Sequence, residues 1–165
     1  MTLSHRRYAI RVALAALLCA STLPASAACL GATPLQAAHA WFERHYIFWN
    51  DPPAVLRDNF APPLLALLLS EQACSEQGVC AIGADPWLDA QDGEARDPQF
   101  QVEAAGEGVS TVRLRYRFVL DDGAPAPTQE VRLRFSGKAR CWRASDLVGP
   151  DGRSLVQSLR EYHGE

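Results

Sequence analysis

The stretch ADPWLDAQD at positions 84–92 carries three aspartates, residues that can bind a metal ion or exchange protons with a substrate. A calcium loop needs oxygen ligands at alternating positions and a closing glutamate, and this spacing supplies neither. A glycosidase-like pair needs a second, distant carboxylate, which nothing in the sequence marks. The pattern is typical of a turn in which Asp85 caps, Pro86 takes the first helical position, and Trp87 and Leu88 enter the core. We therefore predict neither a catalytic residue nor a metal ligand here.

A helix is predicted from Pro34 to about Trp49, because Thr33 is a good N-cap and apolar residues recur with helical spacing. His45 and Tyr46 fall on its apolar stripe. In a catalytic site His45 would act as the general base and Tyr46 would donate to a developing oxyanion. Such side chains more often pack and satisfy one hydrogen bond each, and the sequence offers no clear acid to orient His45. The residues expected to line the interior are Phe42, His45, Tyr46, Trp49 and Trp87.

Two later segments, 112–118 and 131–135, alternate apolar residues with arginines, which is the pattern of strands with one buried face. In a hairpin both rows of arginines would share the outer face. That face is either a solvated surface or a docking surface for an acidic protein or ligand, because guanidinium groups bind carboxylates in two-pronged contacts. The arginines are Arg113, Arg115, Arg117, Arg132 and Arg134. Nucleic acid is not expected as a partner, since the chain has a net charge of −3 and this face lacks interleaved aromatic residues.

Residues 1–27 have the features of a cleavable signal peptide: a basic beginning, a short apolar run and small residues at Ala25 and Ala27. The apolar run is shorter than a membrane span, so no stable membrane span is expected after cleavage. The mature chain, residues 28–165, has the length of one domain. These features predict a periplasmic protein. The alternative is a lipid anchor on Cys29, which follows a sequence that faintly resembles a lipoprotein cleavage site.

Export leaves four cysteines, which in an oxidising compartment indicate two disulfides. Of the three pairings, we predict Cys74 with Cys80, which closes a short loop, and Cys29 with Cys141, which ties the N-terminus to a late strand. A zinc site would need a spacing such as CxxC or HxxxH, which the sequence lacks. The sequence also has no glycine-rich nucleotide-binding motif, so neither a metal nor a cofactor is expected.

The order of the elements predicts an α+β fold, with helices in the first half and antiparallel strands in the second. Helices are expected at 34–49, 54–60, 64–71 and 155–162, and strands at 99–104, 112–118, 131–135 and 140–148. The sheet should curl around the first helix and form a cone-shaped half-barrel.

The sequence DPWL followed by AQD, at positions 85–92, is similar to the DPxLxAQD stretch of an uncharacterised family of bacterial exported proteins. Trp142, Asp146, Leu147 and the segment 150–155 resemble that family's closing strand, turn and helix. The resemblance spans most of residues 34–160, and the Cys74–Cys80 insertion and Ala144 depart from the pattern. It implies a nuclear-transport-factor-2-like fold and a location in the cell envelope. It implies no reaction, because that fold carries enzymes, small-ligand carriers and protein-binding modules alike.

We predict a non-enzymatic periplasmic protein-binding module. One specific version is an immunity protein that neutralises an antibacterial toxin acting in the cell envelope. Two alternatives use a cone-shaped cavity: a carrier of a small apolar ligand, and an enzyme of the isomerase, dehydratase or hydrolase type that acts through His45 and Tyr46. A homodimer formed through the open face of the sheet is a further expectation, and it would compete with docking of another protein there.

Overall fold

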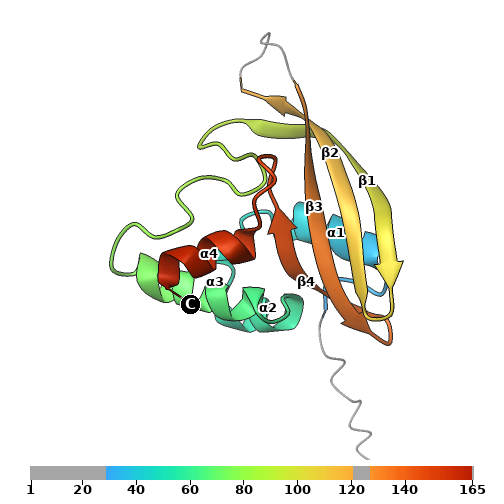
Figure 1. Ribbon diagram of the computed structural model, residues 1–165, viewed down its shortest axis with the longest axis horizontal. Coiled ribbons are helices and arrows are strands. Elements are labelled where there is room, and N and C mark those ends of the chain that lie inside the picture. Colours follow the sequence, from blue (N-terminus) through green and yellow to red (C-terminus); the bar gives the residue numbers. More distant parts are fainter. Residues whose placement is uncertain (1–28, 121–126, 165) are drawn as a thin grey trace, which may run out of the picture.

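The computed structural model describes residues 29–120 and 127–164, which form an α+β fold (Figure 1). The helices are α1 (Pro34–Arg44), the 3₁₀ helix η1 (Phe48–Asn50), α2 (Pro53–Asn59), α3 (Leu64–Ser75) and α4 (Leu155–His163). The strands are β1 (Glu94–Gly106), β2 (Val109–Val119), β3 (Thr128–Lys138) and β4 (Cys141–Val148). Helices precede strands apart from the closing α4, so the predicted fold class is confirmed. The predicted signal peptide, residues 1–27, lies outside the described residues.

The four strands form one antiparallel sheet in the order β1-β2-β3-β4. On its inner face Leu114 pairs with Val131, and both side chains are buried. On its outer face Arg113 pairs with Arg132. Because side chains alternate between the faces of a strand, the two arginine rows share one face, as the sequence predicts.

The two edges of the sheet differ. β1 is exposed along almost all of its length, and register shifts interrupt it after Arg96 and after Val102. Such irregularities discourage the pairing of an edge with another strand. The outer edge of β4 is instead contacted by two short bridges, which join Gly31 to Trp142 and Phe60 to Ala144.

Helix α1 begins at the predicted cap. The hydroxyl group of Thr33 accepts a hydrogen bond from the backbone N–H of Gln36 at 3.2 Å, which satisfies one of the free amide groups of the first turn. The helix ends at Arg44, however, and not near Trp49 as the apolar pattern predicts.

The early end of α1 has a packing cause. His45 is the C-cap, and the chain then turns so that Phe48 enters the core, with its ring edge-on to Trp41 at 5.4 Å. Tyr46 lies in this turn and Trp49 lies in η1. The expectation that both residues lie on one stripe of a long helix is therefore wrong, and their surroundings are set by the turn.

The helices cover different parts of the sheet. In Figure 1, α1 lies behind the strands, whereas α2, α3 and α4 gather beside β4. Helix α1 contacts β1, β2 and β4, and α3 also packs against α4. In α3 the leucines Leu64, Leu67 and Leu68 are buried, and the helix lies where one is predicted at 64–71.

An aromatic cluster occupies the space between α1 and the sheet. Trp41, at its centre, has an exposed fraction of 0 %. Its ring meets four others in edge-to-face contacts at centroid distances of 5.3–6.0 Å: Phe48, Phe60, Trp87 and Phe135. This geometry is favoured by the charge distribution of aromatic rings, and it fills the region where the sequence suggests the interior of a cone.

Candidate functional site

The aspartate-rich stretch folds into a tight turn. Oδ1 of Asp85 accepts a hydrogen bond from the backbone N–H of Trp87 at 2.7 Å. The carbonyl oxygen of Asp85 accepts from the N–H groups of Leu88 at 3.1 Å and Asp89 at 2.9 Å, and its own N–H donates to Ala90 at 2.9 Å. Trp87 and Leu88 are buried, as predicted. Asp85 thus serves as the cap of this turn.

Trp87 links this turn to two tyrosines. Its Nε1–H donates to the carbonyl oxygen of Tyr46 at 2.8 Å, and the Tyr46 ring stacks on the indole with centroids 5.6 Å apart. The hydroxyl of Tyr116 donates to the carbonyl oxygen of Trp87 and lies 2.9 Å from Oε1 of Gln129. Trp87 is therefore buried, and its contacts join the turn to the segment after α1 and to β2.

Burial changes the acid–base behaviour of this region. It raises the pKa of the Asp85 carboxyl group, although hydrogen bonds from the Trp87 N–H and the Tyr46 hydroxyl oppose the shift. Burial, followed by the nearby Asp85 charge, also raises the pKa of Tyr46 and of Tyr116. Both tyrosine hydroxyls are therefore protonated at neutral pH and can donate hydrogen bonds. Asp85 accepts a hydrogen bond from Tyr46, and its charge lies near Tyr116.

His45 has the acidic partner that the sequence does not reveal. Its Nδ1 lies 2.7 Å from Oδ2 of Asp51, and its Nε2 lies 3.3 Å from Nδ2 of Asn59. A carboxylate that orients a histidine occurs in general-base sites, where the second ring nitrogen faces the substrate. Here that nitrogen faces the buried amide of Asn59. The arrangement clamps the end of α1 to η1 and α2.

The remaining residues predicted to line the interior lie partly at the surface. Tyr46 and Trp49 border an open groove with Ile82 and Asp85. Phe42 is partly buried and packs edge-on against Trp87 at 5.4 Å. Of the predicted lining set, Trp87 alone is completely buried.

A second groove, of about 310 Å³, shares the segment 82–85 with the first. Its polar wall includes Asp85, Asp89, Asp151 and Arg153, and leucines from β4 and α4 form its floor. The sequence gives no indication of this groove, because its walls come from segments about sixty residues apart in the chain.

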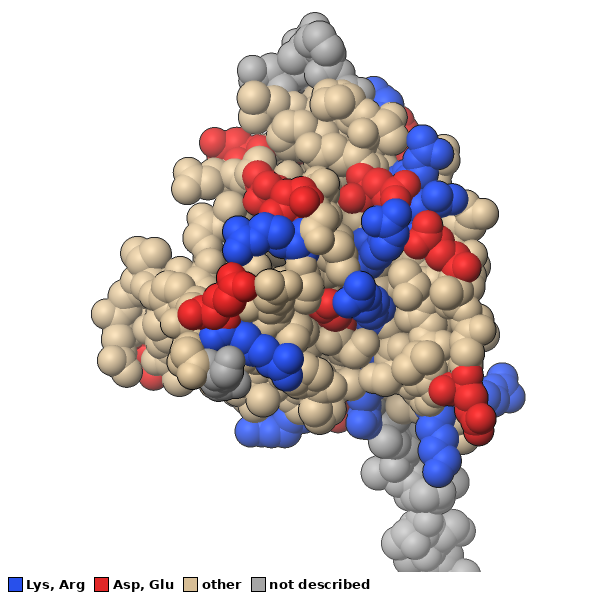
Figure 2. All heavy atoms as spheres, in the orientation of Figure 1, with Lys and Arg blue, Asp and Glu red and all other residues tan. Residues whose placement is uncertain are grey.

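On the outer face of the sheet, acidic and basic side chains lie next to one another and form ion pairs. Figure 2 shows basic and acidic side chains interspersed over the strands. Arg113 and Arg132 face each other, and Glu103 lies 3.4 Å from the first and 3.1 Å from the second. Glu130 is 2.9 Å from Arg132 and 3.8 Å from Arg113. The two carboxylates relieve the repulsion that directly opposed arginines would otherwise cause.

Two further arginines of this outer face are also paired. Nε of Arg117 donates to Oδ2 of Asp97 at 2.7 Å. Nη1 of Arg134 donates to Oδ2 of Asp146 at 3.1 Å. Asp146 is 6 % exposed and also accepts from the Ser154 hydroxyl at 2.8 Å, so this pair anchors the start of α4.

Arg115 differs from its neighbours. It is exposed in the middle of β2, and among the described residues it has no ion-pair or hydrogen-bond partner for its side chain. Glu130 lies opposite it in the sheet but turns to Arg113 and Arg132 instead. Within the part of the chain that the structure describes, the five predicted arginines are therefore mostly neutralised by nearby acids, and Arg115 alone among them has no partner.

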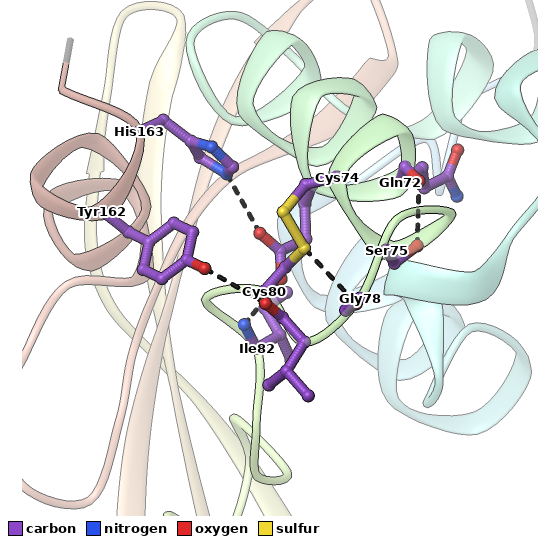
Figure 3. Close-up of a disulfide and its surroundings, with 10 residues drawn as sticks. Gln72, Cys74, Ser75, Gly78, Cys80, Ile82, Tyr162 and His163 are labelled. Carbon is purple, nitrogen blue, oxygen red and sulfur yellow. Dashed lines mark hydrogen bonds and ion pairs between the residues drawn. A yellow bond between two sulfur atoms is a disulfide. The ribbon is translucent and has the colours of Figure 1, made fainter.

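The four cysteines that the structure describes form one disulfide and one side-chain contact. Cys74 and Cys80 are joined by a disulfide at the end of α3, which confirms the predicted short loop (Figure 3). Cys29 and Cys141 are half-buried free thiols in this structure, and their side chains are in hydrogen-bonding contact. Burial, followed by this contact, raises the pKa of Cys29.

Two kinds of feature are absent from the described residues. Residues 29–120 and 127–164 contain no group of three or more His, Cys, Asp or Glu side chains placed to hold a metal ion. They also contain no helix with the length and apolar character needed to cross a lipid bilayer.

Comparison with known proteins gives a short result. No family model, no curated protein and no solved structure matches this chain. The resemblance of residues 85–92 and of the closing strand and helix to an exported family therefore stays a prediction.

Proposed function

We propose that the protein is a non-catalytic module of the cell envelope that binds an acidic surface of another protein through the outer face of its sheet. Arg115 carries this proposal. It is an exposed guanidinium group without an internal counter-charge among the described residues, and paired arginines surround it. Guanidinium groups match carboxylates in geometry and are common at protein interfaces.

The ion pairs around Arg115 are compatible with this role. Arg117 and Arg132 have exposed fractions of 51 % and 48 % in their pairs with acidic residues. Exposed pairs of this kind contribute only about 0–1 kcal/mol to stability, because solvent screens them. Carboxylates of a partner can therefore replace the internal ones at little cost. Until then, the internal pairs hold the arginine side chains in place, which lowers the entropy lost on binding.

The packing of the interior supports binding at the surface over binding in a cavity. The aromatic cluster around Trp41 fills the space between α1 and the sheet. His45 has both ring nitrogens engaged by Asp51 and Asn59. We further propose that the curved sheet and α1 belong to the nuclear-transport-factor-2-like type, with this aromatic filling in place of the open cone of a carrier or an enzyme.

The cellular location is part of the same proposal. A signal peptide at 1–27 and the disulfide between Cys74 and Cys80 both suit an exported protein. The partner is then another protein of the envelope, and an antibacterial toxin that acts there is one partner with the required location.

The experiment is affinity capture from an envelope extract with three immobilised proteins, each purified after export of the full-length chain. They are the wild type, Arg115→Glu and the matched control Arg57→Glu. Arg57 is exposed on α2 and is not part of the sheet. We expect one captured protein to be lost with Arg115→Glu and with increasing salt, and to be kept with Arg57→Glu. Equal capture by all three proteins would refute docking at this face.

Size-exclusion chromatography with light scattering separates docking of a partner from self-association. We expect a monomer for the wild type and for Arg115→Glu. A wild-type dimer that dissociates in Arg115→Glu would mean that the outer face joins two copies of this chain instead.

A further inference from the structure

The N-terminal residues of the described chain are fastened to β4. We call residues 29–31 the strap. The backbone N–H of Leu30 donates to the carbonyl oxygen of Trp142 at 3.1 Å, and the N–H of Trp142 donates to the carbonyl oxygen of Gly31 at 2.9 Å. Leu30 is 3 % exposed and belongs to the core. The strap is therefore held in position by backbone hydrogen bonds to Trp142 and by the packing of Leu30 in the core.

The strap is also closely packed against α1. A Cβ atom at Gly31 would lie 2.6 Å from the backbone nitrogen of Ala37, so only glycine allows this approach. The residue before Leu30 is Cys29, and the residue before Trp142 is Cys141. The bridge between Gly31 and Trp142 places the strap beside the start of β4, and the side chains of Cys29 and Cys141 are in hydrogen-bonding contact there.

We propose that Cys29 and Cys141 are joined by a second disulfide in the exported protein, which locks the strap over the edge of β4. The attachment of the strap to β4 supports this, because a disulfide requires two cysteines that lie close together in the fold. The proposal also excludes a lipid anchor, since the sulfur of Cys29 cannot form both a disulfide and a thioether.

The bond forms by thiol–disulfide exchange with a disulfide-bonded oxidant, such as oxidised glutathione or an envelope oxidoreductase. One protein thiol loses its proton and attacks a sulfur of the oxidant, which releases one oxidant thiolate and leaves a mixed disulfide. The second protein thiol then loses its proton and displaces the other oxidant thiolate. Two protein thiols are oxidised and one oxidant disulfide is reduced to two thiols.

The lock has a structural consequence. Without the strap, the outer edge of β4 near Trp142 would present unpaired backbone groups, which invite pairing with another strand. Cys29 is the first described residue and Cys141 begins β4, so the bond links the start of the described chain to the last strand. Closing so long a loop restricts the unfolded chain more than the Cys74–Cys80 bond does.

The test starts from protein purified after export of the full-length chain and denatured without reductant in iodoacetamide. Peptide mapping is then carried out under non-reducing conditions. We expect a peptide that links Cys29 to Cys141, a peptide that links Cys74 to Cys80, and no alkylation of these four residues. In the Cys29→Ser variant we expect Cys141 to be alkylated while the Cys74–Cys80 peptide is unchanged.

Three outcomes would overturn the proposal. The first is alkylation of both Cys29 and Cys141 in a protein whose Cys74–Cys80 bond is intact. The second is a diacylglycerol mass on Cys29, and the third is a link from Cys29 to Cys74 or Cys80. Each outcome is independent of the docking face at Arg115, so failure of one proposal leaves the other intact.

A second measurement uses the wild-type protein, so that it does not depend on the folding of Cys29→Ser. The wild-type protein is reduced, refolded and exposed to oxidised glutathione, and the two links are followed by the same mapping. We expect the Cys29–Cys141 link to return in folded protein, since its thiols already touch. Its failure to form while Cys74–Cys80 re-forms would also count against the proposal.

Discussion

The carboxylate of Glu71, in α3, lies 3.0 Å from Nε2 of His163, although ninety-two residues separate them in the chain. Glu71 is 5 % exposed, and its other oxygen accepts a hydrogen bond from the N–H of Ile82 at 2.6 Å. Figure 3 shows this region beside the Cys74–Cys80 disulfide, with the hydroxyl of Tyr162 donating to the loop. One buried carboxylate thus ties together α3, α4 and the loop that follows the disulfide.

We expect Glu71→Ala to lower the free energy of unfolding by about 3 kcal/mol, because His163 and the N–H of Ile82 would lose their shared partner inside the protein. The exposed pair His39–Glu43, at 2.9 Å on one face of α1, is the control. Glu43→Ala should cost no more than about 0.5 kcal/mol. Urea unfolding measures both values, and equal costs would mean that Glu71 does not hold these segments together.

Trp41 and Trp87 are both completely buried and differ in one hydrogen bond. Nε1 of Trp87 donates to Tyr46, whereas Nε1 of Trp41 has no partner within the described chain. Replacement by phenylalanine removes a similar volume at each site. We expect Trp87→Phe to cost about 1 kcal/mol more than Trp41→Phe, because it leaves a carbonyl oxygen without its donor. Urea unfolding of the two variants tests this, and a larger cost at Trp41 would contradict it.

Asp85 should make stability depend on pH. Burial raises its pKa in the folded protein above the value of about 3.9 for an unfolded chain, so the folded state holds the proton more tightly. Stability is then lost as the pH rises from the unfolded pKa through the folded one. Asparagine at this position has no proton to lose and can still accept from the Trp87 N–H.

We therefore expect the stability of Asp85→Asn, relative to the wild type, to increase from acid pH and to level off above the folded pKa of Asp85. Urea unfolding across this pH range measures it. Asp92→Asn, at an exposed position of the same stretch, controls for the loss of one negative charge. If the difference in free energy of unfolding between Asp85→Asn and the wild type does not change with pH, or falls as pH rises, burial of Asp85 does not govern its ionisation.

The Cys29 thiol should react with disulfides at higher pH in the folded protein than in the unfolded one, because burial raises its pKa and only the thiolate attacks. We propose to measure its rate of reaction with oxidised glutathione against pH, in Cys141→Ser, with and without urea. A higher midpoint pH is expected in the folded protein. Simple shielding would lower the rate at every pH without moving the midpoint, so an unchanged midpoint would contradict the prediction.

Features that depend on neighbouring residues were predictable from the sequence. Thr33 and Pro34 define the start of α1, because the cap acts on amide groups of the next turn. The alternation in β2 and β3 defines which face is buried. Asp85 caps its own turn, and Cys74 and Cys80 are close because few residues separate them.

Features that depend on remote segments were not predictable. The end of α1 at Arg44 follows from the entry of Phe48 into a core built by other elements. The acidic partners of the outer arginines include Asp97 and Glu103, whose positions depend on the register of β1.

The sequence by itself therefore determined the fold class, the caps of α1 and of the turn at Asp85, and the buried faces of β2 and β3, since these follow from backbone geometry over a few residues. Tertiary structure alone decided which charges meet: His45 with Asp51, Glu71 with His163, and the outer arginines with acids that, within residues 29–120 and 127–164, leave Arg115 without a partner. Electrostatic partners are selected by distance and burial, and both arise only when segments far apart in the chain have packed.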